Sequence, residues 1–196
     1  MKSISLISTF LISLIIFSQN NNQIKQFSFT SEGLNTNEIE VKMKGMDKED
    51  LIEKAKKWIK EKYGNLDVIN KQIDTGKETD EVEKGKKDKK INFDGFTDNA
   101  ICFGLNSDYS CFDAIYEIEL EFDDDEYIFI IDKLEYEIPG NKKDQKIKLN
   151  KSDFHYKDGD LIVGYEKVPT QIENLFNNLN KSLFNYLSDF EQETEW

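Results

Sequence analysis

The sequence predicts an α+β domain in which an antiparallel β-sheet carries two helices on one face. Residues 113–138 have apolar side chains at every second position on both sides of a three-aspartate turn, the pattern of two paired strands. Residues 47–64 and 170–190 repeat apolar residues at helical spacing. Because each helix must bury its apolar stripe, we expect both to pack on the apolar face of the sheet.

The N-terminal residues 1–18 are expected to be a cleaved signal peptide. Lys2 supplies a positive start, residues 4–17 form a short apolar run, and Ser18 is a small residue ahead of a polar stretch. The run is shorter than the ~20 apolar residues of a membrane-spanning helix, which disfavours a permanent anchor. We therefore expect an exported protein (periplasm, cell surface or secreted) with no stable membrane insertion after cleavage.

Residues 19–37 are predicted to be an N-terminal linker, with a short first strand as the alternative. They are rich in Asn, Gln and Ser around one apolar cluster, Phe27 and Phe29. A single domain is expected over residues 38–196. Within it, residues 74–90 contain Val82 as their only apolar residue and so predict a flexible loop.

The first half of this domain begins with a strand and a helix. Residues 38–43 alternate apolar and polar side chains and predict a strand. Asp47 is a suitable N-cap for the helix that follows, and Gly64 ends it. Trp58 lies on the apolar stripe of this helix, so we expect it to anchor the core and not to contact a ligand. Residues 66–73 give a weak indication of another strand.

The two cysteines are predicted to form a disulfide. If residues 106–107 form a two-residue turn, Cys102 lies opposite Cys111 as a non-hydrogen-bonded pair with Cα atoms about 4.5–5.5 Å apart. In an exported chain a structural bond is the default interpretation, contributing about 2–3 kcal/mol. A redox or metal-binding pair is disfavoured, since there is no CxxC spacing and no nearby His.

The register of the central strand pair follows from its turn. If Asp124 and Asp125 occupy the centre of the turn, the apolar residues of the two strands face each other on one side of the sheet. The predicted pairs are Phe122 with Tyr127, Leu120 with Phe129, and Ile118 with Ile131.

The C-terminal part is predicted to contain a turn, a strand and the longest helix. Asp158 and Gly159 indicate the turn, and the alternation over 161–165 indicates a short strand. Thr170 and Glu173 have the spacing of a capping box at the start of the helix.

Several of these segments together resemble a family of exported bacterial proteins of unknown function with a TBP-like domain. They are KGMDKEDLIEKAKKWIKEKY, DVINKQ, YEIELEF, EYIFIIDKLEYEI and the closing helix, and the resemblance covers most of residues 38–190. It implies a TBP-like sheet backed by helices and brings no catalytic residue. The turn of three aspartates departs from the Lys-Asp-Gly of such relatives. The positions that match recurring features of the family are Gly45, Leu51, Trp58, Tyr116 and Tyr127.

Charge and composition exclude several function classes. The chain has 39 acidic and 26 basic residues, a net charge of -13, and every basic residue is Lys. Nucleic acid is therefore not expected as a partner. His155 is the sole His and is expected at the surface, so no catalytic group can be assembled around it, and we expect no enzyme and no cofactor. The carboxylates of 123–126 lack the spacing of a calcium loop, so no metal is expected.

The face of the strand pair opposite the core is the predicted partner site. Aliphatic side chains there alternate with glutamates, and such mixed surfaces often mark binding sites. The leading hypothesis is a non-catalytic module that binds an unknown protein or peptide. The alternative is a carrier of a small hydrophobic ligand held between the sheet and the C-terminal helix. The predicted partner-binding residues are Ile115, Glu117, Glu119, Ile128, Ile130 and Leu134.

Overall fold

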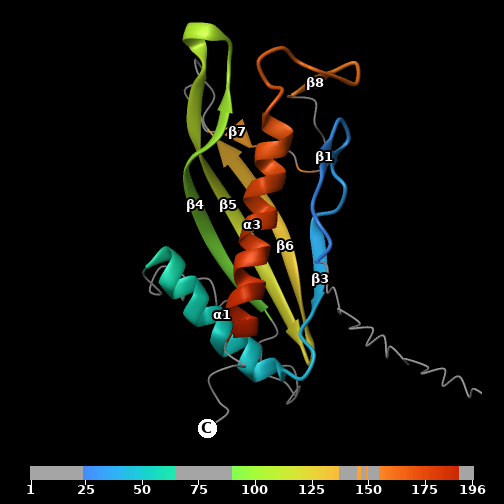
Figure 1. Cartoon of the computed structure of the whole chain (residues 1–196), viewed down its shortest axis with the longest axis vertical. Helices are drawn as coiled ribbons and strands as arrows, with labels where there is room; N and C mark the ends of the chain where they lie inside the picture. The colour runs from blue at the N-terminus through green and yellow to red at the C-terminus, as the bar shows by residue number, and fades with distance from the viewer. Residues whose placement is uncertain (1–23, 65–89, 137–144, 147–148, 150–154, 190–196) are drawn as a thin grey trace, which may run out of the picture.

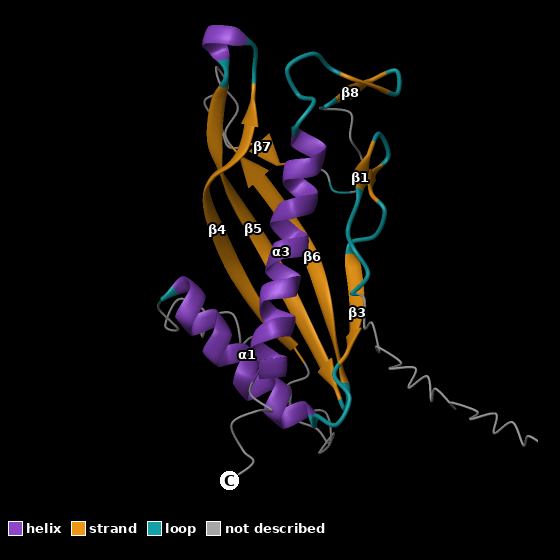
Figure 2. Cartoon of the chain, viewed as in Figure 1, coloured by secondary structure: helices purple, strands orange, loops and turns teal. Residues whose placement is uncertain are grey.

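The computed structural model describes residues 24–64, 90–136, 145–146, 149 and 155–189. The signal peptide expected at 1–18, the strand expected at 66–73 and the loop expected at 74–90, apart from Lys90, lie outside these residues. The described part of the chain forms a main antiparallel sheet of five strands with two helices on the same face (Figures 1 and 2), as the sequence predicts.

The sheet has the strand order β3-β6-β5-β4, and β7 also pairs with β6. Helices α1 (Lys48–Tyr63) and α3 (Val168–Asp189) cover one face, with α3 crossing the long strands and contacting α1 (Figure 1). The strands are β3 (Glu38–Lys42), β4 (Lys90–Phe103), β5 (Ser110–Asp123), β6 (Glu126–Tyr136) and β7 (Gln145–Lys146). Two small hairpins complete the fold: β1 (Phe29–Thr30) with β2 (Gly33–Leu34), and β8 (Tyr156–Lys157) with β9 (Asp160–Leu161).

The predicted register of the central strand pair is confirmed near the turn. Ile118 pairs with Ile131, Leu120 with Phe129, and Phe122 with Tyr127, and all six side chains are buried. Farther from the turn the register shifts, so that Glu117 pairs with Lys133 and not with Asp132. Such a bulge reverses which residues of the strand face the core.

Strand β4 is the element that the sequence analysis missed. It runs antiparallel to β5 along almost its whole length, with Ile91 and Phe93 buried under α1 and α3. Gly95 lies on the same inward face, opposite Tyr116. A Cβ atom at Gly95 would lie 1.9 Å from Tyr116 Cε2, so the tyrosine ring occupies the space that any other residue would need.

Helix α1 forms as predicted. Asp47 is its N-cap, with the carboxylate accepting from the Asp50 amide at 2.9 Å, and Gly64 closes it in a left-handed conformation with φ 85°. Trp58 is a core residue, as expected. Its ring lies edge-on to Phe93 at 6.1 Å, and its Nε1 donates to Ser182 Oγ on α3 at 3.1 Å.

Helix α3 begins earlier than predicted, and the capping box is wrong. The helix starts at Val168, with Pro169 in the first turn, where its missing N–H leaves no donor unpaired. Glu173 therefore lies inside the helix, and its Oε1 accepts from the amide of Phe29 at 2.8 Å.

The linker predicted at 19–37 is wrong for its described part, from Ile24 onward. Phe27 and Phe29 are buried core residues, and Phe27 packs against the rings of Phe129 and Phe176. The segment is held to α3 by Asn177, which accepts from the Phe27 amide at 2.8 Å and donates to the Phe27 carbonyl at 3.0 Å. In the sequence, the burial of this segment is indicated only by two aromatic residues in a polar stretch.

Two predictions near the C-terminal helix also need correction. His155, expected at the surface, is fully buried, with Nε2 2.5 Å from the Tyr136 hydroxyl and its ring against Phe29 and Tyr165. The predicted Asp158–Gly159 turn is present and connects β8 to β9, but the strand expected over 161–165 ends at Leu161.

Candidate binding surface

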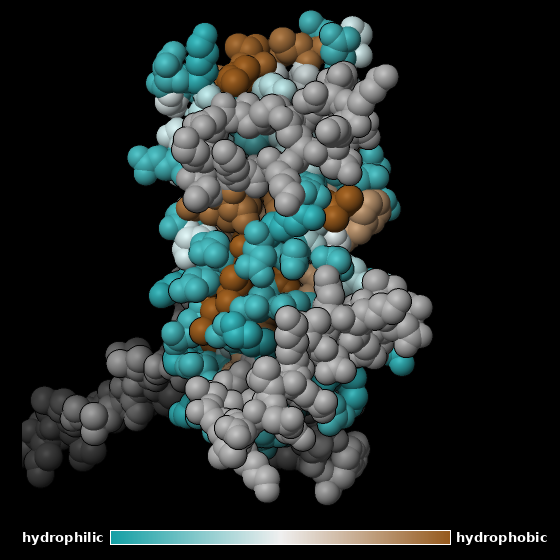
Figure 3. Space-filling view, turned by 180° about the vertical axis from the view of Figure 1, so that it is seen from behind, coloured by the Kyte–Doolittle hydropathy of each residue, from teal (hydrophilic) through white to brown (hydrophobic). Residues whose placement is uncertain are grey.

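The outer face of the sheet, defined as the face opposite α1 and α3, is formed by the outward residues of β3, β6, β5 and β4. No helix among the described residues covers it. Seen from behind, hydrophobic side chains lie between hydrophilic ones along the middle of the molecule (Figure 3). This is the face on which the sequence analysis placed the partner site.

The structure places five of the six predicted partner-binding residues on the outer face. Ile115 is 38% exposed, and Glu117, Glu119 and Ile128 are half-buried. Ile130 is only 9% exposed, so it is a weak candidate for contact with a partner.

The prediction for Leu134 is wrong, because this residue is 0% exposed and belongs to the core. The register shift between Glu117 and Ile118 passes over Asp132 on β6, which moves the later inward positions by one residue. The sequence-based prediction assumed strict alternation outward from the turn, so it could not detect this bulge.

Three glutamates of the outer face are paired with lysines. Lys90 Nζ lies 2.8 Å from Glu119 Oε1 and also contacts Glu121, and these two carboxylates raise the pKa of Lys90 above its usual value. Lys133 Nζ lies 3.0 Å from Glu135 Oε2. Exposed pairs of this kind contribute about 0–1 kcal/mol each, so they shape the charge of the face more than its stability.

The most exposed apolar pair of the face is Phe96 on β4 and Ile115 on β5. The two residues are register partners and are 50% and 38% exposed. They border a hollow of about 340 Å³, here called the disulfide hollow. Its lining residues are Phe96, Asn99, Cys111, Phe112, Asp113, Ile115, Glu135 and Tyr136.

A bulge in β4 shapes this hollow. The pairing of β4 with β5 is irregular between Thr97 and Ile101, and Asn99 adopts a left-handed conformation with φ 50°. The Asn99 amide donates to Asp113 Oδ1 at 2.9 Å, which fixes one carboxylate at the rim.

The Cys102–Cys111 disulfide is present, in the predicted register. The Cα atoms are 4.0 Å apart, and the loop beyond them contains a short 3-10 turn, η1 (Asn106–Asp108), in place of the expected two-residue turn. The Cys102 amide points away from β5 and donates to Gln171 Oε1 on α3 at 2.9 Å. The bond therefore stabilises the hairpin beside the hollow, and the helix holds its edge strand.

Sequence reasoning missed Phe96 and the apolar residues at the far end of the hairpin. Phe96 was not predicted because residues 90–98 were not recognised as part of a strand. The alternation of Ile91, Phe93 and Gly95 could have indicated this strand. The exposed apolar residues at that end of the molecule are Leu105, Tyr109, Leu161 and Val163, the last 68% exposed.

Side chains occupy the space between α3 and the sheet, where the carrier hypothesis placed a ligand. Tyr127 and Phe129 from β6 and Phe176 from α3 are fully buried there. The Tyr127 hydroxyl donates to Asn180 Oδ1 on α3 at 2.8 Å, which joins the two layers directly. The described residues thus give no support to a ligand in this layer.

Within the ranges that the structure describes, no three His, Cys, Asp or Glu side chains gather closely enough to hold a metal ion. In the same ranges, no helix is long and apolar enough to cross a membrane.

In comparisons with known proteins, no family model and no curated protein matches the chain. Two solved structures are similar. One is a TBP-like protein from Parabacteroides distasonis, with 17% identity and a TM-score of 0.48, covering 77% of this chain and 90% of that one. The other is a DUF4468 family protein from Bacteroides ovatus, with 11% identity and a TM-score of 0.53, covering 84% and 90%. At such identity the likeness to the DUF4468 family protein, whose TM-score exceeds 0.5, shows the fold alone.

Proposed function

We propose that the protein is an exported, non-catalytic module that binds a protein or peptide through the outer face of its sheet. The observation that carries the proposal is the Phe96–Ile115 pair, two large apolar side chains exposed beside the disulfide hollow. Exposed aromatic and aliphatic groups next to a hollow are typical anchors for a partner's apolar residue.

The charges around the pair indicate what such a partner would carry. Asp94, Asp113 and Glu117 lie on neighbouring outward positions of β4 and β5, and Lys133 on β6 offsets only part of their negative charge. An acidic rim favours a segment with an apolar anchor flanked by Lys or Arg, because opposite charges speed association and exclude acidic competitors.

Export is supported by two features. The sequence of residues 1–18 has the pattern of a signal peptide, and both cysteines of the chain are in one disulfide, the state typical of oxidising compartments. Fractionation of the producing cells tests this part, since we expect the mature form outside the cytoplasm and an uncleaved cytoplasmic form would contradict it.

Photo-crosslinking tests the binding face. A photoreactive residue at Ile115 is expected to give a discrete adduct in envelope extract, whereas the same residue at Val163, which is 68% exposed, is the matched control and should give none. Ile115→Lys should abolish capture and change the free energy of unfolding by less than about 1 kcal/mol, because the site is partly exposed. Equal adducts from both positions, or capture by Ile115→Lys at the level of the original protein, would contradict the proposal.

A further inference from the structure

Helix α3 has an unusual composition. Only three of the 22 residues of this helix are charged, whereas ten of the 16 residues of α1 are charged. Uncharged amides take their place, and Asn is a poorer helix former than Lys or Glu. Helix stability therefore does not account for the choice of residues. The amide residues of α3 are Gln171, Asn174, Asn177, Asn178, Asn180 and Asn185.

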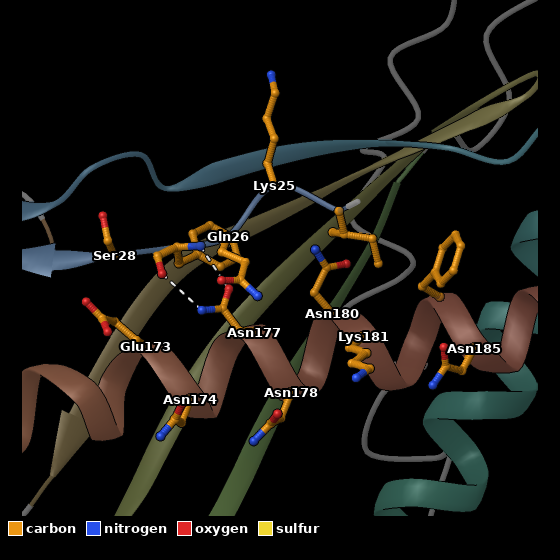
Figure 4. Close-up of a pocket in the computed structure, with 13 residues that line it drawn as sticks. Lys25, Gln26, Ser28, Glu173, Asn174, Asn177, Asn178, Asn180, Lys181 and Asn185 are labelled. Carbon is orange, nitrogen blue, oxygen red and sulfur yellow. Dashed lines mark hydrogen bonds between the residues drawn. The ribbon is translucent and has the colours of Figure 1, made fainter. Parts of the chain in front are cut away.

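Five of these six amides line a groove between α3 and the chain segment 24–28, here called the amide groove. Its volume is about 520 Å³, and Figure 4 shows it with α3 on one side and the segment of Lys25 and Gln26 on the other. Phe184 adds an apolar surface to the lining, and the charged residues Lys25, Lys181 and Glu173 leave a net charge of +1. The groove is therefore polar and only weakly charged within a strongly acidic chain.

Asn180 provides a buried donor at the base of the groove. The residue is 1% exposed, and its Oδ1 accepts from Tyr127. Its Nδ2 has no hydrogen-bond partner among the described residues. In Figure 4 the side chains of Asn177 and Asn180 rise from α3 toward the segment of Lys25 and Gln26. Since an unpaired buried N–H is unfavourable, an oxygen acceptor beside Asn180 Nδ2 would stabilise the site.

A second hollow lies on the other side of Asn174 and Asn178. These two asparagines line this cavity of about 340 Å³ together with Thr97 on β4, Gln171 and Lys62. These two exposed asparagines thus form a ridge with a hollow on each side. A ligand longer than one ring could lie across the ridge and contact amides in both hollows.

We propose that the amide groove and its ridge bind a neutral oligosaccharide. Each Asn or Gln amide offers both a donor and an acceptor, which matches the hydroxyl groups of a sugar, and Phe184 offers an apolar surface for a sugar ring. Uncharged amides outnumber the three charged residues of the lining, which favours hydrogen bonding to a neutral ligand. Among the described residues, the lining contains no Trp or Tyr, which are enriched in protein interfaces, and its polar amides disfavour a lipid. This site is separate from the outer face and does not depend on the function proposed above.

Titration of the isotope-labelled protein with soluble oligomers of glucose, mannose, galactose and N-acetylglucosamine tests the proposal by NMR. We expect at least one probe to cause saturable shifts in the side-chain NH₂ signals of Asn174, Asn178 and Asn180. The double variant Asn174→Ala/Asn178→Ala should bind that probe about tenfold or more weakly, because it loses two hydrogen-bonding amides. It should melt no lower than the original protein, since Ala is the better helix former.

Thr170→Ala is the matched control, because Thr170 is exposed on the same helix and lines neither hollow. Its affinity for the probe should be unchanged. The proposal is overturned if no probe gives saturable shifts, in which case water alone satisfies Asn180 Nδ2. It is equally overturned if the double variant binds like the original protein, or if the shifts centre on Phe96 and Ile115.

Discussion

Gly95 shows how one residue can determine the packing of its neighbours. The Tyr116 ring lies across this glycine, and its hydroxyl is 3.0 Å from the Tyr63 hydroxyl and 3.1 Å from Thr97 Oγ1. The missing side chain thus lets a large ring join β4, β5 and α1 in one hydrogen-bonded cluster.

Gly95→Ala is expected to lower the free energy of unfolding by about 1–3 kcal/mol, measured by urea denaturation. Intrinsic strand preference alone would predict the opposite sign, since Gly weakens strands. In the Tyr116→Leu background Gly95→Ala should lower the free energy of unfolding much less, because the aromatic ring that overlaps the new Cβ atom is absent. An equal loss in both backgrounds would show that the close approach of the ring is not the cause.

His155 is the residue whose surroundings differ most from the sequence-based expectation. It is enclosed by the rings of Phe29, Tyr136 and Tyr165, and burial lowers its pKa from 6.5 to about 4. In the unfolded chain the ring takes up a proton near pH 6.5, but in the folded protein it does so only near pH 4. The unfolded state therefore binds more protons in this interval, and stability must fall as the pH is lowered through it.

The free energy of unfolding is expected to fall by up to roughly 1.4 kcal/mol per pH unit between pH 6.5 and about pH 4. His155→Gln should lose this part of the pH dependence, because Gln does not titrate. Urea denaturation of both proteins across the interval gives the two slopes. Parallel slopes would mean that carboxylates, and not His155, govern the acid response.

At the scale of elements, α3 organises the fold by holding the N-terminal segment and the edge strand β4 through polar side chains. Asn177 binds both backbone groups of Phe27, Glu173 binds the amide of Phe29, and Gln171 binds the amide of Cys102. Polar side chains on one helix thereby secure the N-terminal segment on one side and the edge strand β4 on the other.

Asn177→Ala is expected to release the N-terminal segment. The variant loses two hydrogen bonds to partly buried backbone groups, so we expect a loss of about 1–3 kcal/mol. Hydrogen exchange of the Phe27 and Phe29 amides should accelerate by a larger factor than exchange in β5. Asn178→Ala, one position along and exposed, is the matched control and should leave both amides protected. Unchanged protection in Asn177→Ala would show that burial of the phenylalanines alone holds the segment.

At the scale of the whole molecule, the net charge of -13 opposes the compact state. The lysine–glutamate pairs of the outer face offset little of this repulsion, because exposed pairs are weak. The net charge therefore reduces the stability of the fold.

Raising the ionic strength from about 0.01 M to 0.15 M is expected to increase the melting temperature by a few degrees, because the Debye length shortens from about 30 to 8 Å. Calorimetry in sodium chloride measures this, with an equal osmolarity of glycerol as the uncharged control. A melting temperature that falls with salt would show that ion pairs such as Lys90 with Glu119 outweigh the overall repulsion.

Features defined by neighbours in the chain were predictable from the sequence alone. The ends of α1 depend on Asp47 and Gly64, the register of β5 and β6 near the turn depends on their alternation, and the disulfide depends on the distance of both cysteines from one loop. Each of these is a local property, because caps, turns and period-two patterns act over a few residues.

Tertiary contacts alone decided the remaining features. Phe27 and Phe29 are core residues because α3 meets their backbone, and Leu134 turns inward because the bulge at Asp132 in its own strand, β6, shifts its pairing with β5. Phe96 joins Ile115 only through the pairing of β4 with β5, and Asn180 faces the amide groove only because α3 crosses the sheet. Such features depend on residues far apart in the chain, and their energies arise only when distant segments meet.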